Sequence, residues 1–182
     1  MLILGTIASS KFVETDTGAM YPLQNIVVGS AGASFITFNN IPNTYTHLQV
    51  RIMSLASYNG NQSLSATYNS DTGSNYSSHW LTGNGSAASA GTTTNDNIQY
   101  YGFGLWPNEP VVSVIDILDY ANTNKYKTMR CLTGLDRNGS GHVYLFTGSW
   151  RNTNAITSIK IAANSGNFNQ YSSFSLYGIK AA

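Results

Sequence analysis

The sequence predicts an all-β protein, an antiparallel β-sandwich that is jelly-roll-like, and three observations support this prediction. Several segments alternate apolar and polar side chains with a period of two residues, which is the pattern of a half-buried strand. Polar stretches that contain Asn, Gly or Pro separate these segments, as turns between strands do. No segment shows the apolar stripe of an amphipathic helix. Roughly ten or eleven short strands with polar connections are typical of a sandwich or jelly roll.

The clearest strand covers residues 47–52, where the apolar side chains of Leu48, Val50 and Ile52 share one face and polar side chains occupy the other. The run 111–118 is almost continuously apolar, which predicts a strand in the middle of a sheet. The other expected strands cover residues 24–28, 34–38, 62–68, 76–82, 97–106, 125–133, 142–150, 156–163 and 173–180.

Two of the connections carry specific predictions. Asn138 and Gly139 lie between two expected strands and both tolerate positive φ, so they predict a tight hairpin turn. Residues 82–97 contain three consecutive Thr and several Gly. This low-complexity stretch is too polar for a core and is expected to form a long exposed loop.

Length, charge and cysteine usage exclude several classes of protein. The chain has 182 residues, 9% of them charged, and a formal net charge of +1. The length predicts a single domain, residues 1–182. The small net charge and the lack of a basic stripe predict no nucleic-acid partner, and no apolar run approaches the about 18 residues of a membrane span. The apolar start Met1–Leu4 is interrupted by Gly5 and follows no Lys or Arg, so we expect a strand there and not a secretory signal. The single Cys131 predicts a buried thiol and assembly in a reducing cytoplasm.

Side chains that carry chemistry are scarce. The chain has two Glu and three His, and it contains no nucleophile elbow, phosphate-binding loop or zinc-helix motif. We therefore expect no enzymatic activity and no cofactor, although a Ser-His-Asp triad need not be visible in sequence and is left open. Asp136 to Ser140 resemble the start of a calcium loop, but the twelfth position is Thr147, which has no carboxylate. We expect a hairpin turn there and no metal site.

Aromatic residues supply the one binding hypothesis that the residues themselves suggest. Trp80 lies beside the polar stretch, and Tyr100, Tyr101 and Trp106 lie just beyond it. Tyr and Trp rings can stack on sugar rings, and they are also enriched at protein interfaces. Large aromatics equally fill cores, so core packing, a subunit interface and a glycan site are all open for these four. The low charge favours the interface over the glycan site.

Two segments carry a resemblance to a known family. The first is Ile41–Arg51, with the sequence IPNTYTHLQVR, and the second runs from Trp150 through a Gly166-Asn167-Phe168 turn to the strand SFSLYGIK at 173–180. Together they resemble small structural proteins of tailed bacteriophages, which are carried on the virion as capsid decoration (cement) proteins or as parts of tails and fibres. The rest of the chain is similar to that family only in general character.

The resemblance implies a non-enzymatic virion structural protein, assembled in the host cytoplasm and located on the outer surface of the virion. The leading expectation is a capsid decoration protein that oligomerises as a trimer or dimer, binds the major capsid protein and stabilises the phage head. Edge strands and the N-terminal segment, with 1–10 as a docking strand, are the expected contact elements. The alternative is a tail-fibre or baseplate component that binds a host surface glycan through the four aromatics. A sugar hydrolase is a third alternative, for which only Asp116 and Asp119 offer a candidate carboxylate pair.

Overall fold

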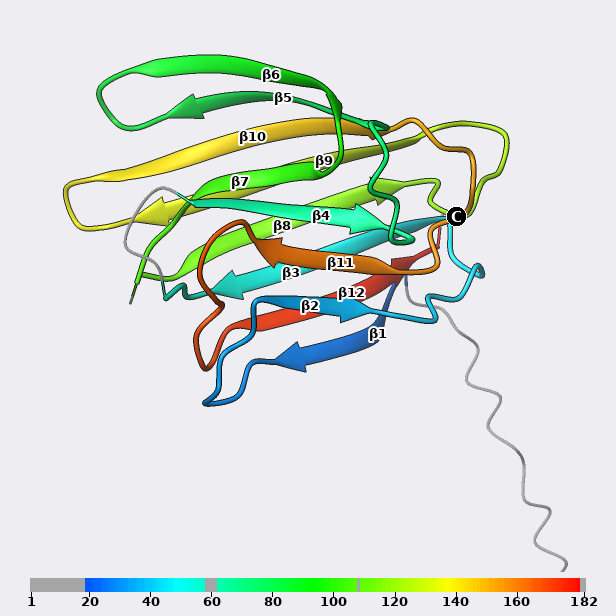
Figure 1. Cartoon of the computed structure of the whole chain (residues 1–182), viewed down its shortest axis with the longest axis horizontal. Coiled ribbons are helices and arrows are strands. Elements are labelled where there is room, and N and C mark those ends of the chain that lie inside the picture. Colours follow the sequence, from blue (N-terminus) through cyan, green and yellow to red (C-terminus); the bar gives the residue numbers. More distant parts are fainter. Residues whose placement is uncertain (1–18, 58–61, 108, 181–182) are drawn as a thin grey trace, which may run out of the picture.

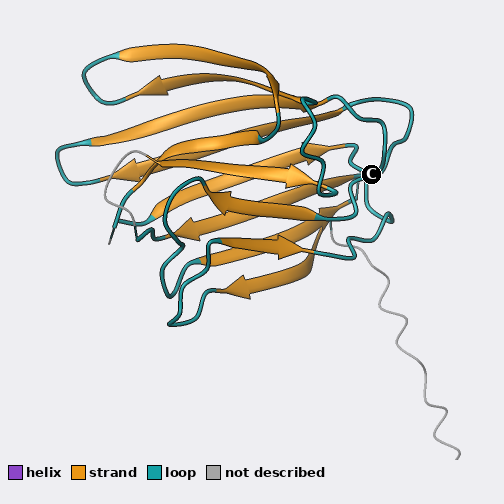
Figure 2. Cartoon of the chain, in the orientation of Figure 1, coloured by secondary structure: helices purple, strands orange, loops and turns teal. Residues whose placement is uncertain are grey.

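The computed structural model describes residues 19–57, 62–107 and 109–180, and this part of the chain forms two antiparallel sheets that pack face to face as a β-sandwich (Figure 1). Its regular structure is all strand, without helices, and teal loops join the orange strands in Figure 2. The strands are β1 (Met20–Val27), β2 (Phe35–Phe38), β3 (His47–Ser54), β4 (Gln62–Tyr68), β5 (Tyr76–Gly83), β6 (Ala88–Asp96), β7 (Gln99–Leu105), β8 (Val111–Leu118), β9 (Lys127–Asp136), β10 (Gly141–Trp150), β11 (Ile159–Ala163) and β12 (Ser173–Ile179). The predicted fold class is confirmed.

The topology is nested. The larger sheet has the order β1-β12-β3-β8-β9-β10-β5-β6, and the smaller has the order β2-β11-β4-β7. If the hairpins β5–β6 and β9–β10 are set aside, the first remaining strand pairs with the last, the second with the second-last, and so inward to β4 with β7. This wrapping of eight strands is compatible with a jelly roll. The two hairpins widen only the larger sheet, so that it extends past β8 on one side.

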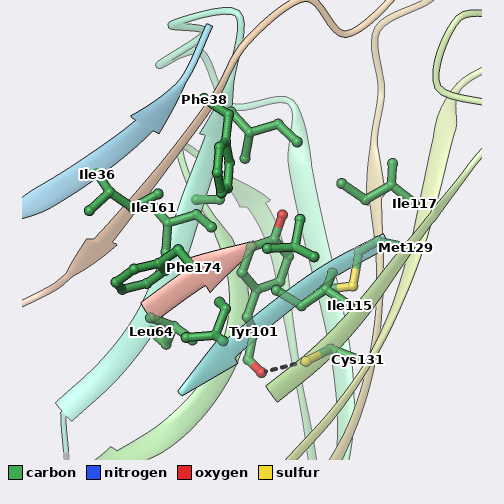
Figure 3. Packing of buried hydrophobic residues seen from close by; sticks show 14 of the residues in the cluster. Ile36, Phe38, Leu64, Tyr101, Ile115, Ile117, Met129, Cys131, Ile161 and Phe174 are labelled. Atoms are coloured by element: carbon green, nitrogen blue, oxygen red, sulfur yellow. Dashed lines mark hydrogen bonds between the residues drawn. The ribbon is translucent and has the colours of Figure 1, made fainter. Parts of the chain in front are cut away.

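The core lies between the two sheets. Figure 3 shows Ile36, Phe38, Leu64 and Ile161 of the smaller sheet among side chains of β8, β9 and β12. Each fully buried large apolar side chain contributes about 1.5–3 kcal/mol. Four buried hydroxyls form two pairs: the Tyr68 and Tyr101 hydroxyls lie 2.6 Å apart, and the Ser113 and Thr133 hydroxyls 2.8 Å apart. These pairs are favourable because an unpaired polar group in the core would cost free energy.

Within the described residues, the strand predictions hold except at one place. Strand β8 lies in the middle of the larger sheet, as its apolar run predicts. The expected exposed loop over 82–97 is wrong, because most of it is strand β6, which pairs antiparallel with β5. As an edge strand with exposed side chains, β6 needs no apolar alternation. Its backbone pairing and the β propensity of its three consecutive Thr suffice.

The hairpin turn at Asn138 and Gly139 is confirmed. The two residues have φ of 52° and 110°, and the Arg137 amide donates a hydrogen bond to the Ser140 carbonyl at 2.7 Å. Both φ values are positive, as a type I′ turn requires. The Asp136 carboxylate accepts a hydrogen bond from the Asn138 amide at 2.9 Å, so it stabilises the turn from within.

The two edges of the larger sheet differ. Edge strand β1 carries Pro22 and an irregular register between Pro22 and Gln24, and both features oppose pairing with another strand. Edge strand β6 contains neither Pro nor Lys. The expected docking strand at 1–10 lies outside the described residues.

A buried lysine closes one end of the sandwich. Lys127 is 1% exposed, and its ammonium donates hydrogen bonds to the carbonyls of Asn122, Lys125 and Thr153 at 2.5, 3.0 and 3.0 Å. Three carbonyl acceptors match the three N–H donors of an ammonium. Lys127 therefore ties the β8–β9 connection to the segment that follows β10.

Asp71 joins the β4–β5 turn to the core. One of its carboxylate oxygens accepts hydrogen bonds from the Trp150 indole at 2.7 Å and from the Asn75 amide at 2.9 Å, and the other accepts from the Gly73 backbone at 2.9 Å. Burial raises the pKa of Asp71, but these hydrogen bonds outweigh it and hold the pKa below its usual value of 3.8.

Candidate interaction surface

The four aromatics singled out in the sequence do not form one patch. Trp80 lies on β5, Tyr100 and Tyr101 lie on β7, and Trp106 follows β7. Tyr101 is fully buried, so it cannot contact a partner or a sugar. The structure therefore removes Tyr101 from the candidate contacts predicted from the sequence. Adjacent residues of a strand point to opposite faces, and at this pair it is Tyr101 that points into the core.

The other three aromatics pack against the core and are partly buried. The Trp80 ring lies 5.7 Å from Phe146 between centroids and covers Gly91 on the neighbouring strand, where a Cβ would come within 2.3 Å of the ring. The Arg137 guanidinium lies 4.0 Å from the centroid of Trp106, as in a cation–π contact. One ring face of Trp80 and one of Trp106 are thus occupied within the chain itself. Trp150 is buried, as the core alternative expects.

An exposed apolar surface lies elsewhere, on the outer side of the larger sheet. The smaller sheet covers one side of the larger, and no element of the described residues packs on the other. Large apolar side chains of β5, β8, β9 and β10 lie on this side and are about half exposed: Leu81 54%, Val112 53%, Leu132 55%, Val143 58% and Leu145 48%. Together with Val114, Ala88 and Ala90 we call them the apolar face.

The strand register aligns these side chains in rows across the sheet. Leu81 pairs with Leu145, Leu145 with Leu132, and Leu132 with Val114. These three leucines and Val114 form an apolar ridge that runs straight across four strands. A second row lies two residues along each strand, about 7 Å away. It runs from Gly83 through Val143 and Gly134 to Val112.

The second row is a hollow because two of its four members are glycines. A Cβ built on Gly83 or on Gly134 would meet no atom within 4 Å. A cavity of about 710 Å³ opens here and is lined by both glycines, Val112 and Val143. A second hollow of about 450 Å³ lies on the other side of the ridge, beside Thr147. The apolar face therefore combines a raised row with recesses on both sides.

Charges border this surface and do not enter it. The Arg130 guanidinium pairs with the Asp116 carboxylate at 3.1 Å, one row beyond the ridge. Asp136 lies on β9 beyond the other row, two residues from Gly134. A surface without charge at its centre and with charges at its rim has the composition of a protein interface.

Both carboxylates of the candidate pair for sugar hydrolysis form ion pairs with basic side chains. Asp116 is held by Arg130, and Asp119 lies 2.5 Å from the Lys125 ammonium. The hydrogen bond from Lys125 lowers the pKa of Asp119 below its usual value of 3.8, whereas a glycosidic general acid needs a raised pKa. The residues that the structure describes hold no group of three or more His, Cys, Asp or Glu arranged to bind a metal ion.

The apolar face had a signal in the sequence. Val143-Tyr144-Leu145-Phe146 places apolar side chains on both faces of one strand, and so does the run of β8. Such runs are typical of strands covered on both sides, but here one side is exposed.

The chain matches no family model, no curated protein and no solved structure. Within the described ranges there is also no helix that is long and apolar enough to cross a membrane. Function is therefore inferred from the apolar face and from the resemblance noted in the sequence.

Proposed function

We propose that this chain is a non-enzymatic structural protein of a phage virion, a capsid decoration protein that oligomerises and stabilises the head. The observation that carries the proposal is the apolar face. Soluble monomers rarely expose a contiguous apolar surface larger than a few hundred Å², and larger ones mark sites of protein association.

The free energy available at this surface is considerable. Complete burial of a Val or Leu side chain contributes about 1.5–3 kcal/mol, so five side chains that are half exposed can still gain about 4–8 kcal/mol in total. Association itself costs at least about 4 kcal/mol. The apolar face therefore suits an assembly protein in which several copies and several contacts act together.

Composition and resemblance support the same role. Only 9% of the residues are charged, which suits a protein that packs against its own copies and against shell proteins. On this proposal the chain resides on the outer surface of the virion, and its partners are the major capsid protein and other copies of itself.

The decisive experiment adds the purified chain to virions that lack it and locates it by cryo-electron microscopy. Regular density over capsomer junctions or symmetry axes is expected. Leu132→Asp, on the apolar face, should lower the occupancy. Phe35→Asp, at a position that is 49% exposed on β2 of the smaller sheet, should not. Density only at the tail tip would replace the decoration role by the tail-fibre alternative, with glycan binding then tested at Trp80, Tyr100 and Trp106. No density on any particle would overturn the proposal.

A further inference from the structure

We infer that the apolar face binds a second copy of this chain, with the two larger sheets packed face to face about a two-fold axis. The inference deepens the proposed function, because it names the partner of the same surface. It can be tested on the purified chain without a virion.

The shape of the face is self-complementary. Consider a two-fold axis that lies in the interface, perpendicular to the strands, and passes between the two rows. This axis exchanges the two rows. Each ridge then lies over the partner's second row. The leucines of β9 and β5 meet glycines, whereas Leu145 and Val114 contact Val143 of the partner subunit and Val112 of the partner subunit. On this axis Leu132 faces Gly134 of the partner subunit, and Leu81 faces Gly83 of the partner subunit. A side chain opposite a glycine is the ridge-in-groove fit that an isologous contact requires.

The charges at the rim are complementary on the same axis. Arg130 lies one row beyond the ridge on β9, and Asp136 lies one row beyond the hollow on the same strand. The exchange of rows places Arg130 opposite Asp136 of the partner subunit. The contact therefore brings opposite charges together at its rim and none into its centre.

The size of the face also fits. Strand β8 has eight residues, so four strands about 4.8 Å apart and about 27 Å long present roughly 500 Å² of flat surface. Side-chain relief raises the accessible area above this value. A standard interface buries about 800 Å² per partner, and aligned packing of two sheets is a common arrangement.

The test uses a substitution that fills the hollow and leaves the subunit intact. Gly134 has open space at its Cβ position and no positive φ, so Gly134→Leu is tolerated by the fold and blocks the partner's ridge. Sedimentation equilibrium of the full chain should show a dimer for the wild type. Gly134→Leu should weaken dimerisation by about 30-fold or more, as loss of an interface hot spot does. Phe35→Glu, on the outer side of the smaller sheet, should leave the dimer unchanged.

A cross-link tests the axis itself. A short bismaleimide cross-linker should convert Leu132→Cys/Gly134→Cys into a covalent dimer. On this axis each thiol introduced at position 132 faces a thiol introduced at position 134 of the other copy. Sheets packed face to face lie about 10 Å apart, which a cross-linker spans and a disulfide does not. Far-UV circular dichroism establishes that each variant is folded.

A wild type that is monomeric at about 100 μM, well above the micromolar constants of weak complexes, a trimer, or a dimer that persists in folded Gly134→Leu would overturn the inference. A monomer that still occupies particles would overturn it and leave the proposed function standing. A dimer that binds no particle would support the inference and overturn the proposed function.

Discussion

Replacement of Lys127 by Met should destabilise the protein strongly, although the two side chains are similar in length. The ammonium of Lys127 is buried and satisfies the carbonyls of three residues in two connections. Met fills the same space but donates no hydrogen bond, so three carbonyls lose their partner. Hydrogen bonds to charged groups contribute about 1.5–3 kcal/mol each, and the desolvation of the ammonium offsets part of their sum. We expect a net loss of about 3–5 kcal/mol, which lowers Tm by about 10 °C in a chain of this size.

Thermal and urea unfolding at pH 7, followed by circular dichroism, measure this loss. Lys125→Met is the matched control, because Lys125 lies two residues away, has a side chain that is 54% exposed and forms an ion pair with Asp119. An exposed pair contributes at most about 1 kcal/mol, so the control should shift Tm by no more than about 3 °C. Equal Tm values for Lys127→Met and the wild type would refute the reasoning, because they would show that the three hydrogen bonds only balance the cost of burying the charge.

Three further predictions concern Asp71, Cys131 and Gly91. Since the pKa of Asp71 is lower in the folded state than its usual 3.8, its contribution is complete above that value and is lost as pH falls through the folded pKa. Urea unfolding from pH 5 to pH 2 should therefore show a steeper loss for the wild type than for Asp71→Asn, and equal slopes would contradict the assignment. Burial raises the pKa of the Cys131 thiol from 9.0 to about 12. The folded protein should thus resist thiol reagents at pH 8, and above pH 9 this group should lower stability by up to about 1.4 kcal/mol per pH unit, a component absent in Cys131→Ala. Gly91→Ala places a methyl within 2.3 Å of the Trp80 ring and should cost about 1–3 kcal/mol with a shift in indole fluorescence. Gly29→Ala has open space at its Cβ position and lies outside the apolar face, so it should be neutral. A neutral Gly91→Ala would show that the ring moves freely.

Much of the fold was predictable because most strands must place apolar side chains on the one face that the other sheet covers. The smaller sheet covers the inner side of the larger, so β3 must place Leu48, Val50 and Ile52 inward, and the period of two is visible. Strand β6 was not predicted because an edge strand of small polar residues buries little apolar surface and so shows no alternation. Its pairing partner is fixed by the turn after β5 and not by its own pattern.

The interaction surface was harder to predict for a different reason. Apolar side chains at both odd and even positions of a strand indicate that both faces of the strand are covered. They do not indicate whether the second face is covered by the same chain or by another chain. Leu132 and Leu145 look in sequence like core residues. Tyr100 and Tyr101 show the converse: alternation requires that one of them point inward, but nothing in the sequence says which one.

The hairpin of β9 and β10 has a consequence for folding. In β10, Leu145 alternates with Phe146, so a slip of one residue would still place an apolar side chain inward there. Burial within β10 alone thus discriminates weakly between the native hairpin and a slipped one. In β9 the same slip would turn Arg130 and Asp136 toward the core, where an unpaired charge is costly. The charges of β9, which contribute nothing to the core, therefore act together with the positive-φ turn between the two strands to protect the hairpin against misfolding.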